Sequence, residues 1–333
     1  MKHILVTGGS GYVGSHVAKM LFEHGYYPVV FDLMVNQRPW ANPHWPGVTG
    51  DINNKWHLDT LFNNFEFDAV IHLAASSEVG ASVTNPIRYY QNNVGGTAAL
   101  LDTCVKYNVK NLVFSSTSSV YGVVDPANLP TKEDHPKNPV TSYGSSKWAV
   151  ECMLRDVDVA HGIRSVSLRY FNASGASPDG AIGEHRLSPS HLIPSIQHVV
   201  NGKKDTFVFN GTDYPTKDGT AVRDFTHVWD IADAHIKALE YLQAGGKTDS
   251  FNIGAGQGKS IIEVFTEFQT QADVVVPFRS GPRRPGDIAM NYADISKAKE
   301  VLGWEPKMSD CKSIVRDAVK WYKSDLYKSL VHG

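Results

Sequence analysis

The feature that most constrains this chain is a glycine-rich turn near its start, Gly8-Gly9-Ser10-Gly11-Tyr12-Val13-Gly14. An apolar run before it predicts a strand over His3–Thr7, and the pattern after it predicts a helix over Tyr12–His24. Glycine permits the tight turn, lets the backbone approach a pyrophosphate and allows close packing of helix on strand. The start of a helix also favours negative charge. The turn therefore predicts a dinucleotide-binding βαβ unit.

The end of the second predicted strand, Pro28–Asp32, indicates which dinucleotide is bound. A carboxylate at this position accepts hydrogen bonds from both adenosine ribose hydroxyls and repels a 2′-phosphate. Leu33 follows Asp32 where a binder of the phosphorylated form would favour arginine. NAD is therefore predicted rather than NADP, and Asp51 and Ile52 are expected to reach its adenine from the next turn.

Strand and helix patterns alternate through the rest of the first half. Further strands are predicted over Ala69–Leu73, Asn111–Ser115 and Ser165–Tyr170, and helices over His57–Asn63, Pro86–Tyr107 and Ser142–His161. The strands are nearly continuous apolar runs, so both faces of their sheet should be covered. The alternation predicts an α/β fold with a Rossmann-type doubly wound parallel sheet.

The alternation of strands and helices ends after about Tyr170, where a loop-rich stretch is predicted over Asn172–Ser190. Helices are then predicted over His191–Asn201, Trp229–Leu242, Ser260–Thr270 and Ser309–Lys323, and short strands over Phe207–Asn210, Phe251–Ile253 and Val274–Pro277. We expect an NAD-binding Rossmann domain over residues 1–171. A smaller C-terminal α/β lobe, mainly substrate-binding, is expected over residues 172–333, with some segments returning to the sheet.

Tyr143 and Lys147 stand one helical turn apart at the start of the predicted helix Ser142–His161, so both side chains project from one face. An ammonium beside the phenol is expected to lower the tyrosine pKa from its usual ~10. The hydroxyl-rich stretch Ser115–Ser119 leaves the fourth predicted strand at the sheet edge where ligands bind. Thr117 is therefore expected to hydrogen-bond the reacting oxygen and to complete a Thr/Tyr/Lys group.

The composition disfavours several other classes of function. Lys+Arg total 32 and Asp+Glu total 34, a formal net charge of −2, so the chain lacks the basic field that nucleic-acid binding needs. Its three cysteines are far apart and no metal-ligand spacing is present. We expect no metal, free thiols and a cytoplasmic location. The apolar start is too short for a signal peptide, and no apolar run approaches the ~18 residues of a membrane span.

Several longer motifs add a family resemblance over nearly the whole chain. They are Tyr89-Tyr90-Gln91-Asn92-Asn93-Val94, Arg169-Tyr170-Phe171-Asn172, the run from Asp213 to Asp224, Asn252-Ile253-Gly254 and Pro282-Arg283-Arg284-Pro285-Gly286-Asp287. With the glycine-rich turn and the Tyr/Lys pair, the sequence resembles the extended short-chain dehydrogenase/reductase family, and within it the UDP-glucose 4-epimerases.

The resemblance implies roles position by position. The catalytic group is Thr117, Tyr143 and Lys147. The cofactor shell comprises Gly8, Gly11, Tyr12, Val13, Gly14, Asp32, Asp51, Ile52, Leu73, Ala74, Ala75, Asn92, Ser115 and Phe171, with Tyr143 and Lys147. The nucleotide-sugar positions are Thr117, Asn172, His191, Leu192, Arg223, Arg284 and Asp287. Two guanidinium forks suit a diphosphate. The resemblance also implies a homodimer that pairs the helices Pro86–Tyr107 and Ser142–His161.

The expected function is NAD-dependent interconversion of UDP-glucose and UDP-galactose. The preferred sugar stays open, because Asn291 stands where some relatives carry a bulkier tyrosine, so an N-acetylated sugar or a pentose remains an alternative. A 4,6-dehydratase is disfavoured because Ser118 and Ser119 replace the Asp-Glu pair that water loss requires. A non-catalytic NAD sensor is disfavoured because the Tyr/Lys pair is present.

Overall fold

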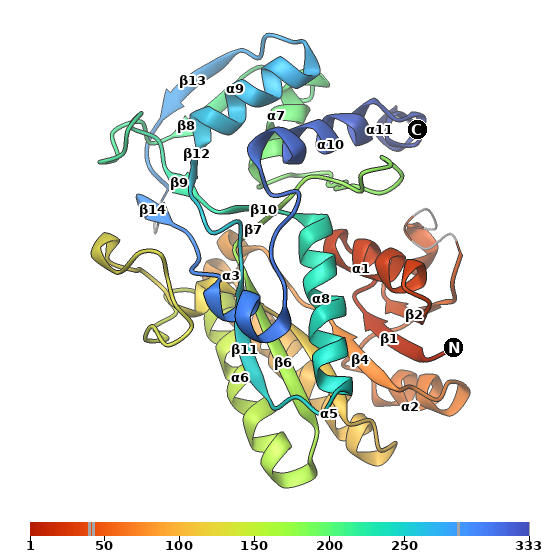
Figure 1. Cartoon of the computed structure of the whole chain (residues 1–333). Helices are drawn as coiled ribbons and strands as arrows, with labels where there is room; N and C mark the ends of the chain where they lie inside the picture. The colour runs from red at the N-terminus through yellow and green to blue at the C-terminus, as the bar shows by residue number, and fades with distance from the viewer. Residues whose placement is uncertain (39–40, 42–43, 285–286, 333) are drawn as a thin grey trace.

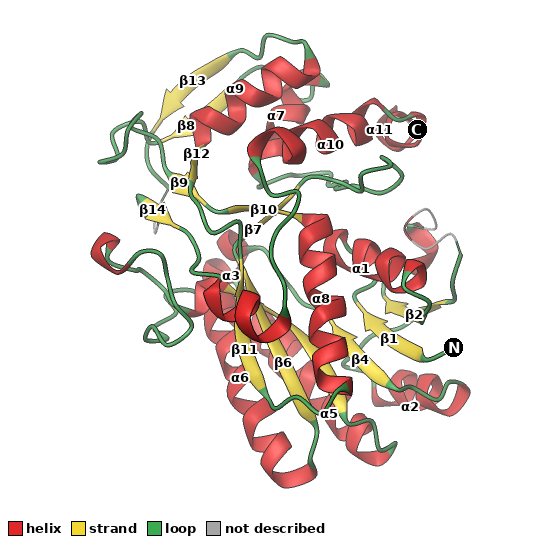
Figure 2. Ribbon diagram, viewed as in Figure 1, coloured by secondary structure: helices red, strands yellow, loops and turns green. Residues whose placement is uncertain are grey.

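Seven parallel strands form the central sheet, in the order β11-β6-β5-β4-β1-β2-β3 (Figure 2). A computed structural model describes residues 1–38, 41, 44–284 and 287–332 of the chain. The strands are β1 (His3–Thr7), β2 (Tyr27–Asp32), β3 (Gly47–Thr49), β4 (Ala69–His72), β5 (Asn111–Thr117), β6 (Arg164–Tyr170) and β11 (Asp249–Ile253). The strand order reverses direction between β1 and β4, which is where open α/β sheets bind ligands. The predicted fold class is confirmed.

Helices cover both faces of this sheet (Figure 1). On one face, α1 (Tyr12–Glu23) and α8 (Val228–Gln243) pack together over a buried apolar cluster that includes Val6, Val113 and Leu239. On the other, α2 (Lys55–Asn64), α5 (Gly96–Lys106) and α6 (Ser142–His161) enclose a second cluster. Because both faces are covered, β1, β2 and β4 are largely apolar, whereas β5, β6 and β11 also carry buried polar side chains.

The helix predicted over Pro86–Tyr107 contains an irregular turn. It begins as α4 (Pro86–Tyr89), widens to a π-helical turn over Tyr90–Gly95 and continues as α5. Such turns are found preferentially at functional sites. Here the widened turn carries Asn92 and Asn93, and the Asn93 amide donates to the Ser76 carbonyl at 3.1 Å and to Ser146 Oγ on α6 at 3.0 Å.

A third apolar cluster lies in the C-terminal lobe, at the top of Figure 1. It is built from α7 (Leu192–Val200), β8 (Phe207–Asn210), α9 (Ile261–Ala272), α10 (Cys311–Lys323) and α11 (Asp325–His332), and β13 (Phe278–Gly281) pairs with β8. Short strands connect the lobe to the sheet: β7 (Asn172–Ser174) pairs with β10 (Phe225–His227), and β9 (Val222–Arg223) pairs with β12 (Lys259–Ser260) and β14 (Met290–Asn291). The domain division at residue 171 stays a prediction.

One strand prediction in this lobe is wrong. Residues 274–277 form a loop, and the strand begins after them as β13, which pairs with β8 from Phe278 onward. The apolar run misleads because Val276 is buried in the core of the lobe while Pro277 has no amide hydrogen to give to a sheet. The predicted loop over Asn172–Ser190 likewise begins as β7.

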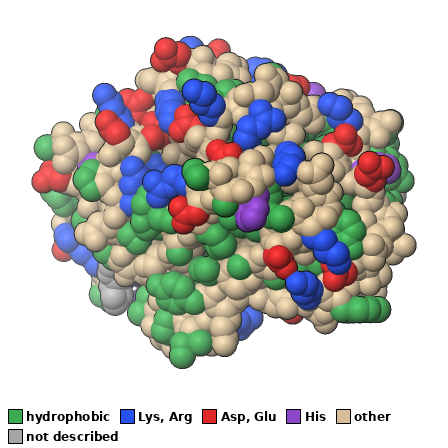
Figure 3. Space-filling model, turned by 90° about the horizontal axis from the view of Figure 1, so that it is seen from below, with side chains coloured by type: hydrophobic (Ala, Val, Ile, Leu, Met, Phe, Trp, Pro, Cys, Tyr) green, Lys and Arg blue, Asp and Glu red, His purple; other side chains and the backbone are tan. Residues whose placement is uncertain are grey.

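The surface mixes charges of both signs. On the face shown in Figure 3, acidic and basic side chains alternate around patches of hydrophobic ones. Across the described part of the chain, no helix combines the length and apolar character that a membrane span requires. Within the same residues, no group of His, Cys, Asp and Glu is placed to hold a metal ion.

Candidate active site

The glycine-rich turn lies against the end of β4, and backbone touches backbone there. Gly8 has φ +73°, and a Cβ at this position would lie 2.6 Å from the amide nitrogen of Ala74. A Cβ on Gly14 would lie 2.2 Å from the Gly8 carbonyl oxygen. Gly11 is the N-cap of α1 and offers no side chain to the first-turn amides. These amides therefore suit a phosphate group.

Asp32 borders the turn at the end of β2. Its carboxylate accepts the Ser10 amide hydrogen at 3.0 Å and the Met34 amide hydrogen at 2.8 Å, and it is only partly buried. A carboxylate oxygen accepts more than one hydrogen bond, so the group has capacity left for ribose hydroxyls. Amide donors for a pyrophosphate and an acceptor for a ribose thus lie beside each other, and these residues fit a dinucleotide.

The other cofactor positions lie at the same edge of the sheet but differ in how their side chains are used. Leu73, Ala74 and Ala75 follow β4 and are partly exposed, as is Phe171 after β6. Ile52 is 5% exposed in the core. Three others already have hydrogen-bonding partners: Asp51 accepts from Asn53, Asn92 donates to Ser76, and the Tyr12 hydroxyl donates to the Gly175 carbonyl. Val13 packs against the α1/α8 cluster.

The end of β5 and the start of α6 bring the predicted catalytic residues together. The Thr117 side chain lies close enough to the Tyr143 phenol to lower its pKa, and its own hydroxyl donates to Ser119 Oγ at 3.2 Å. Lys147 Nζ donates to the Ser115 carbonyl at 2.8 Å and lies 4.7 Å from the centre of the Phe114 ring. Thr117 thus lies beside the phenol, and Lys147 lies one turn further along the same helix face.

The pKa values of this pair correct one expectation. Burial raises the pKa of Tyr143 to about 12, although the hydrogen bond with Thr117 lowers it. Burial also lowers the pKa of Lys147 to about 7, against the opposing charge of Glu151. The expectation that Lys147 lowers the tyrosine pKa is therefore wrong, because burial of the phenol is the largest influence on that pKa and Lys147 is not among the groups that shift it.

Three of the predicted substrate positions lie together beyond the sheet edge. Arg223 on β9 pairs with Asp287 at 3.3 Å, and its side chain is 15% exposed. Burial lowers the pKa of Arg223, the charge of Asp287 opposes this, and Arg284 lies near enough to lower it further. Pro285 and Gly286 of the same motif lie outside the described residues. Two cations around one carboxylate leave net positive charge for a diphosphate.

Asn172, His191 and Leu192 are placed differently. The Asn172 amide group donates to the Asp224 carbonyl at 3.1 Å, which ties β7 to the Arg223 segment. The Nδ1 atom of His191 lies 2.8 Å from the buried Glu184 carboxylate, so this side chain pairs with Glu184 rather than with Arg223. Leu192 opens α7 and packs on the lobe core. The roles assigned to all site residues stay predictions.

Comparisons with known proteins point to one family. The model of the NAD dependent epimerase/dehydratase family matches residues 4–254. This chain belongs to that family. A UDP-glucose 4-epimerase of Bacillus subtilis is 42% identical over 338 residues, which cover 98% of this chain and 99% of the relative. The predicted family is confirmed.

Two solved epimerase structures have the same fold. The UDP-glucose 4-epimerase of Brucella ovis in complex with NAD is 42% identical, with a TM-score of 0.91 over 96% of this chain and 98% of that one. The enzyme of Bifidobacterium longum in complex with NAD+ and UDP is 35% identical, with a TM-score of 0.89 over 98% and 99%. Both similarities extend over the C-terminal lobe, beyond the segment that the family model matches.

Two buried groups beside the predicted catalytic residues were not predicted from the sequence. Tyr170 is hydrogen-bonded to Ser115 Oγ, and Glu151 is hydrogen-bonded to Ser116. Glu151 stands one helical turn beyond Lys147 on the same face, and that spacing was a signal from which it could be found. Tyr170 gave no such signal, because its partner comes from another strand.

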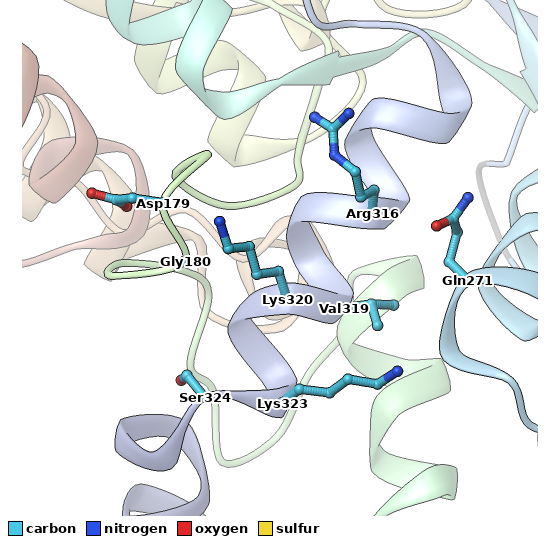
Figure 4. A pocket seen from close by; sticks show the side chains of 8 residues that line it. All are labelled: Asp179, Gly180, Gln271, Arg316, Val319, Lys320, Lys323 and Ser324. Atoms are coloured by element: carbon cyan, nitrogen blue, oxygen red, sulfur yellow. The ribbon is translucent and has the colours of Figure 1, made fainter.

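A separate cavity of about 520 Å³ lies in the lobe between α10, α9 and the loop at residues 179–180 (Figure 4). Its basic side chains are mostly engaged: Arg316 pairs with Asp317, and Lys320 donates to the Pro178 carbonyl at 2.7 Å. None of the predicted catalytic or binding residues lines it. The cavity is therefore separate from the predicted site at the sheet edge.

Proposed function

We propose that this protein interconverts UDP-glucose and UDP-galactose by oxidising and re-reducing carbon 4 of the sugar. The observation that carries the proposal is the meeting of Thr117, Tyr143 and Lys147 beside a backbone cradle that fits a dinucleotide. Family membership and full-length relatives named as UDP-glucose 4-epimerases support it.

Tyr143 acts as the base that takes the proton from the 4-hydroxyl and later returns one. Thr117 lies beside the phenol, where its hydroxyl can bond the sugar oxygen that Tyr143 deprotonates. When bound, oxidised NAD supplies the hydride acceptor and a positive charge near the phenol. Such a charge is needed because burial raises the pKa of Tyr143 to about 12. Lys147 supplies a donor for the ribose hydroxyls of the cofactor.

Arg223, Arg284 and Asp287 hold the UDP portion. The chemistry requires the 4-keto sugar to present its other face before it is re-reduced, so the sugar must turn while the diphosphate stays fixed. Binding energy is then best placed on the part of the substrate that does not react. The ion pair of Arg223 with Asp287 positions its guanidinium for that purpose.

The test is turnover of UDP-galactose to UDP-glucose, followed by NMR. Tyr143→Phe should lower kcat by about a thousandfold while NAD and UDP binding stay intact. Tyr107→Phe is the matched control: Tyr107 lies at the C-terminal end of α5, and its hydroxyl bonds Asn63 at 2.8 Å. An inactive wild-type protein would refute the function, whereas an active Tyr143→Phe would refute only the assigned base.

An N-acetylated UDP-sugar is the second candidate substrate. Asn291 on β14 lies opposite Arg223 on β9, and its side-chain oxygen is buried without a partner in the described part of the chain. That oxygen suits the N–H of an acetamido group. Comparing kcat/KM for UDP-galactose and UDP-N-acetylgalactosamine on one preparation decides between the two sugars.

We also propose a cytoplasmic homodimer. The three cysteines are free thiols, which suits a reducing compartment. Val83 in α3 (Val79–Thr84) and Ile87 in α4 are 64% and 69% exposed, and Val159 near the end of α6 is 91% exposed. Exposed apolar side chains on neighbouring helices favour association. Light scattering should give twice the chain mass of 36.6 kDa.

A further inference from the structure

Three side chains of α6 contact three consecutive residues at the end of β5. Tyr143 lies beside Thr117, Lys147 donates to the Ser115 carbonyl, and Glu151 accepts from the Ser116 hydroxyl. The three helix residues are spaced by four, so they form one line along the helix face. The contact of Glu151 with Ser116 therefore fixes the same strand end against which the reacting groups are aligned.

Glu151 is itself held from the neighbouring strand. Arg169 on β6 lies directly opposite Ser116, and its Nε donates to the Glu151 carboxylate at 2.9 Å. The side chains of Arg169 and Glu151 are 3% and 5% exposed. The Nη1 atom of Arg169 donates to the Tyr121 hydroxyl at 2.9 Å. The carboxylate thus has a fixed position rather than a choice of rotamers.

The buried polar side chains continue onto the next strand of the sheet. Asn252 on β11 lies opposite Arg169, and its side-chain oxygen accepts from the Tyr121 hydroxyl at 2.6 Å. Ser116, Arg169 and Asn252 are therefore side by side on three adjacent strands, all buried. Figure 1 shows β11, β6 and α6 next to one another at this place.

Stability alone does not explain this arrangement. Removing two charges from water costs free energy, and apolar side chains of similar size stabilise a core as well as a buried ion pair does. What a buried pair adds is a single geometry. Here that geometry sets the distance of α6 from β5, on which the alignment of Tyr143 with Thr117 depends.

We propose that Glu151 is a positioning residue of the active site, which locks α6 to β5 through Ser116 and Arg169 and so places Tyr143 and Lys147. The inference rests on the proposed function, in which Tyr143 is the base. Glu151 touches neither sugar nor cofactor in this role. Its effect should therefore appear in kcat and leave substrate binding unchanged.

The experiment compares two hydroxyl deletions in the holoenzyme. Ser116→Ala removes the donor to Glu151, whereas Ser165→Ala removes a buried hydroxyl on β6 that has no partner among the described residues. The two serines are 0% and 1% exposed, so the deletions are matched. We expect kcat to fall about tenfold in Ser116→Ala, since small misplacement of reacting groups is costly. KM for UDP-galactose and bound NAD should stay within twofold, and Ser165→Ala should behave as wild type.

A second variant guards against a general loss of structure. Glu151→Asp keeps the charge and withdraws the carboxylate by one methylene, so it should lower kcat in the same way. Equal turnover of Ser116→Ala and Ser165→Ala would overturn the inference, as would a parallel change in kcat, KM and NAD content. Failure of both Ser116→Ala and Glu151→Asp to fold would also overturn it, because the contacts would then serve the fold. Absence of wild-type epimerase activity would instead refute the proposed function.

Discussion

The sheet side and the lobe side of the candidate site are built in opposite ways. On the sheet side, Gly8 and Gly14 bring backbone against backbone, and an added carbon at Gly14 would overlap the Gly8 carbonyl at 2.2 Å. On the lobe side, the predicted grip on the diphosphate consists of long side chains, Arg223 and Arg284, around Asp287. The sheet side of the site depends on the absence of side chains, whereas the lobe side depends on long side chains that extend to the ligand.

This difference predicts how each side tolerates change. A contact between backbone atoms contains no flexible group that can move aside, so adding a single methyl group there destabilises the fold. Replacing an arginine, whose guanidinium sits on a flexible side chain, removes a charge but leaves the surrounding fold in place. Damage on the sheet side should thus affect stability and NAD binding together, and damage on the lobe side should affect UDP binding alone.

The largest effect should come from Gly14→Ala. The new Cβ would meet backbone atoms of Gly8 and Gly9, which cannot yield without shifting the turn. We expect about 3 kcal/mol of lost stability. If the turn shifts instead, we expect NAD binding to be weaker by about a hundredfold. Thermal unfolding and NAD titration measure the two losses.

Gly80→Ala is the matched control for this change. Gly80 lies in α3 (Val79–Thr84), and a Cβ there would meet nothing within 4 Å. Alanine in a helix interior is favoured over glycine by up to about 1 kcal/mol, so this variant should be as stable as the wild type or more so. If Gly14→Ala and Gly80→Ala contained equal amounts of NAD, the predicted sensitivity of the sheet side to an added methyl group would be wrong.

The sheet side could be predicted from the sequence because its signals are local. The turn, the strand before it and the helix after it are contiguous, and Asp32 stands at a fixed place in the second strand. The position of β13 could not be predicted, because burial of Val276 in the lobe core gives the preceding loop, residues 274–277, the pattern of a strand. The pairing of His191 with Glu184 could not be predicted either, since it depends on how the loop around residue 184 folds back.

The catalytic group shows a second limit of local reasoning. The spacing of Tyr143 and Lys147 was enough to predict that they share a helix face. It did not reveal that burial raises the pKa of the phenol and lowers that of the ammonium, because desolvation depends on everything packed around the pair. The spacing of Glu151 from Lys147 places both on one helix face, but its contact with Ser116 could not be predicted, because that contact exists only once α6 lies on β5.

A smaller effect, confined to substrate binding, is expected for Arg223→Met on the lobe side. Loss of the charge should weaken UDP binding by about 2 kcal/mol, the usual cost of a charge-assisted contact. Unfolding temperature and NAD binding should change little, because Asp287 is partly exposed and tolerates the loss of its partner. Calorimetric titration with UDP measures the effect.

The control for the lobe side is Arg283→Met, in the same motif as Arg284. Arg283 is exposed, pairs with Asp213 at 2.8 Å and covers the Tyr214 ring at 4.2 Å. An exposed pair contributes little, so UDP binding should change by less than about 0.5 kcal/mol. If Arg283→Met weakens UDP binding as much as Arg223→Met does, the assignment of the diphosphate grip to Arg223 is wrong.

The two sides should also differ in their response to acid. The sheet side contains His16, His72 and His235, all fully buried, and burial lowers their pKa to about 4, about 3 and about 4. In the lobe, His198 is only partly buried, and burial lowers its pKa to a lesser degree. An unfolded histidine has a pKa near ~6.5. As the pH falls, each of these three sheet-side histidines is therefore protonated in the unfolded chain at a higher pH than in the folded protein.

The smallest predicted effect is the change in pH dependence when one such histidine is removed. Because the folded pKa lies below the unfolded one, the stability contributed by His235 is complete above about pH 6.5 and falls by about 1.4 kcal/mol per pH unit down to its folded value. His235→Leu should remove that slope between pH 6 and 5. It should cost little at pH 7.5, since the Nε2 atom of His235 has no partner among the described residues. His198→Leu should remove less of the slope, and urea titrations at each pH measure both. Equal slopes for the two variants would show that burial of histidine does not distinguish the sheet side from the lobe.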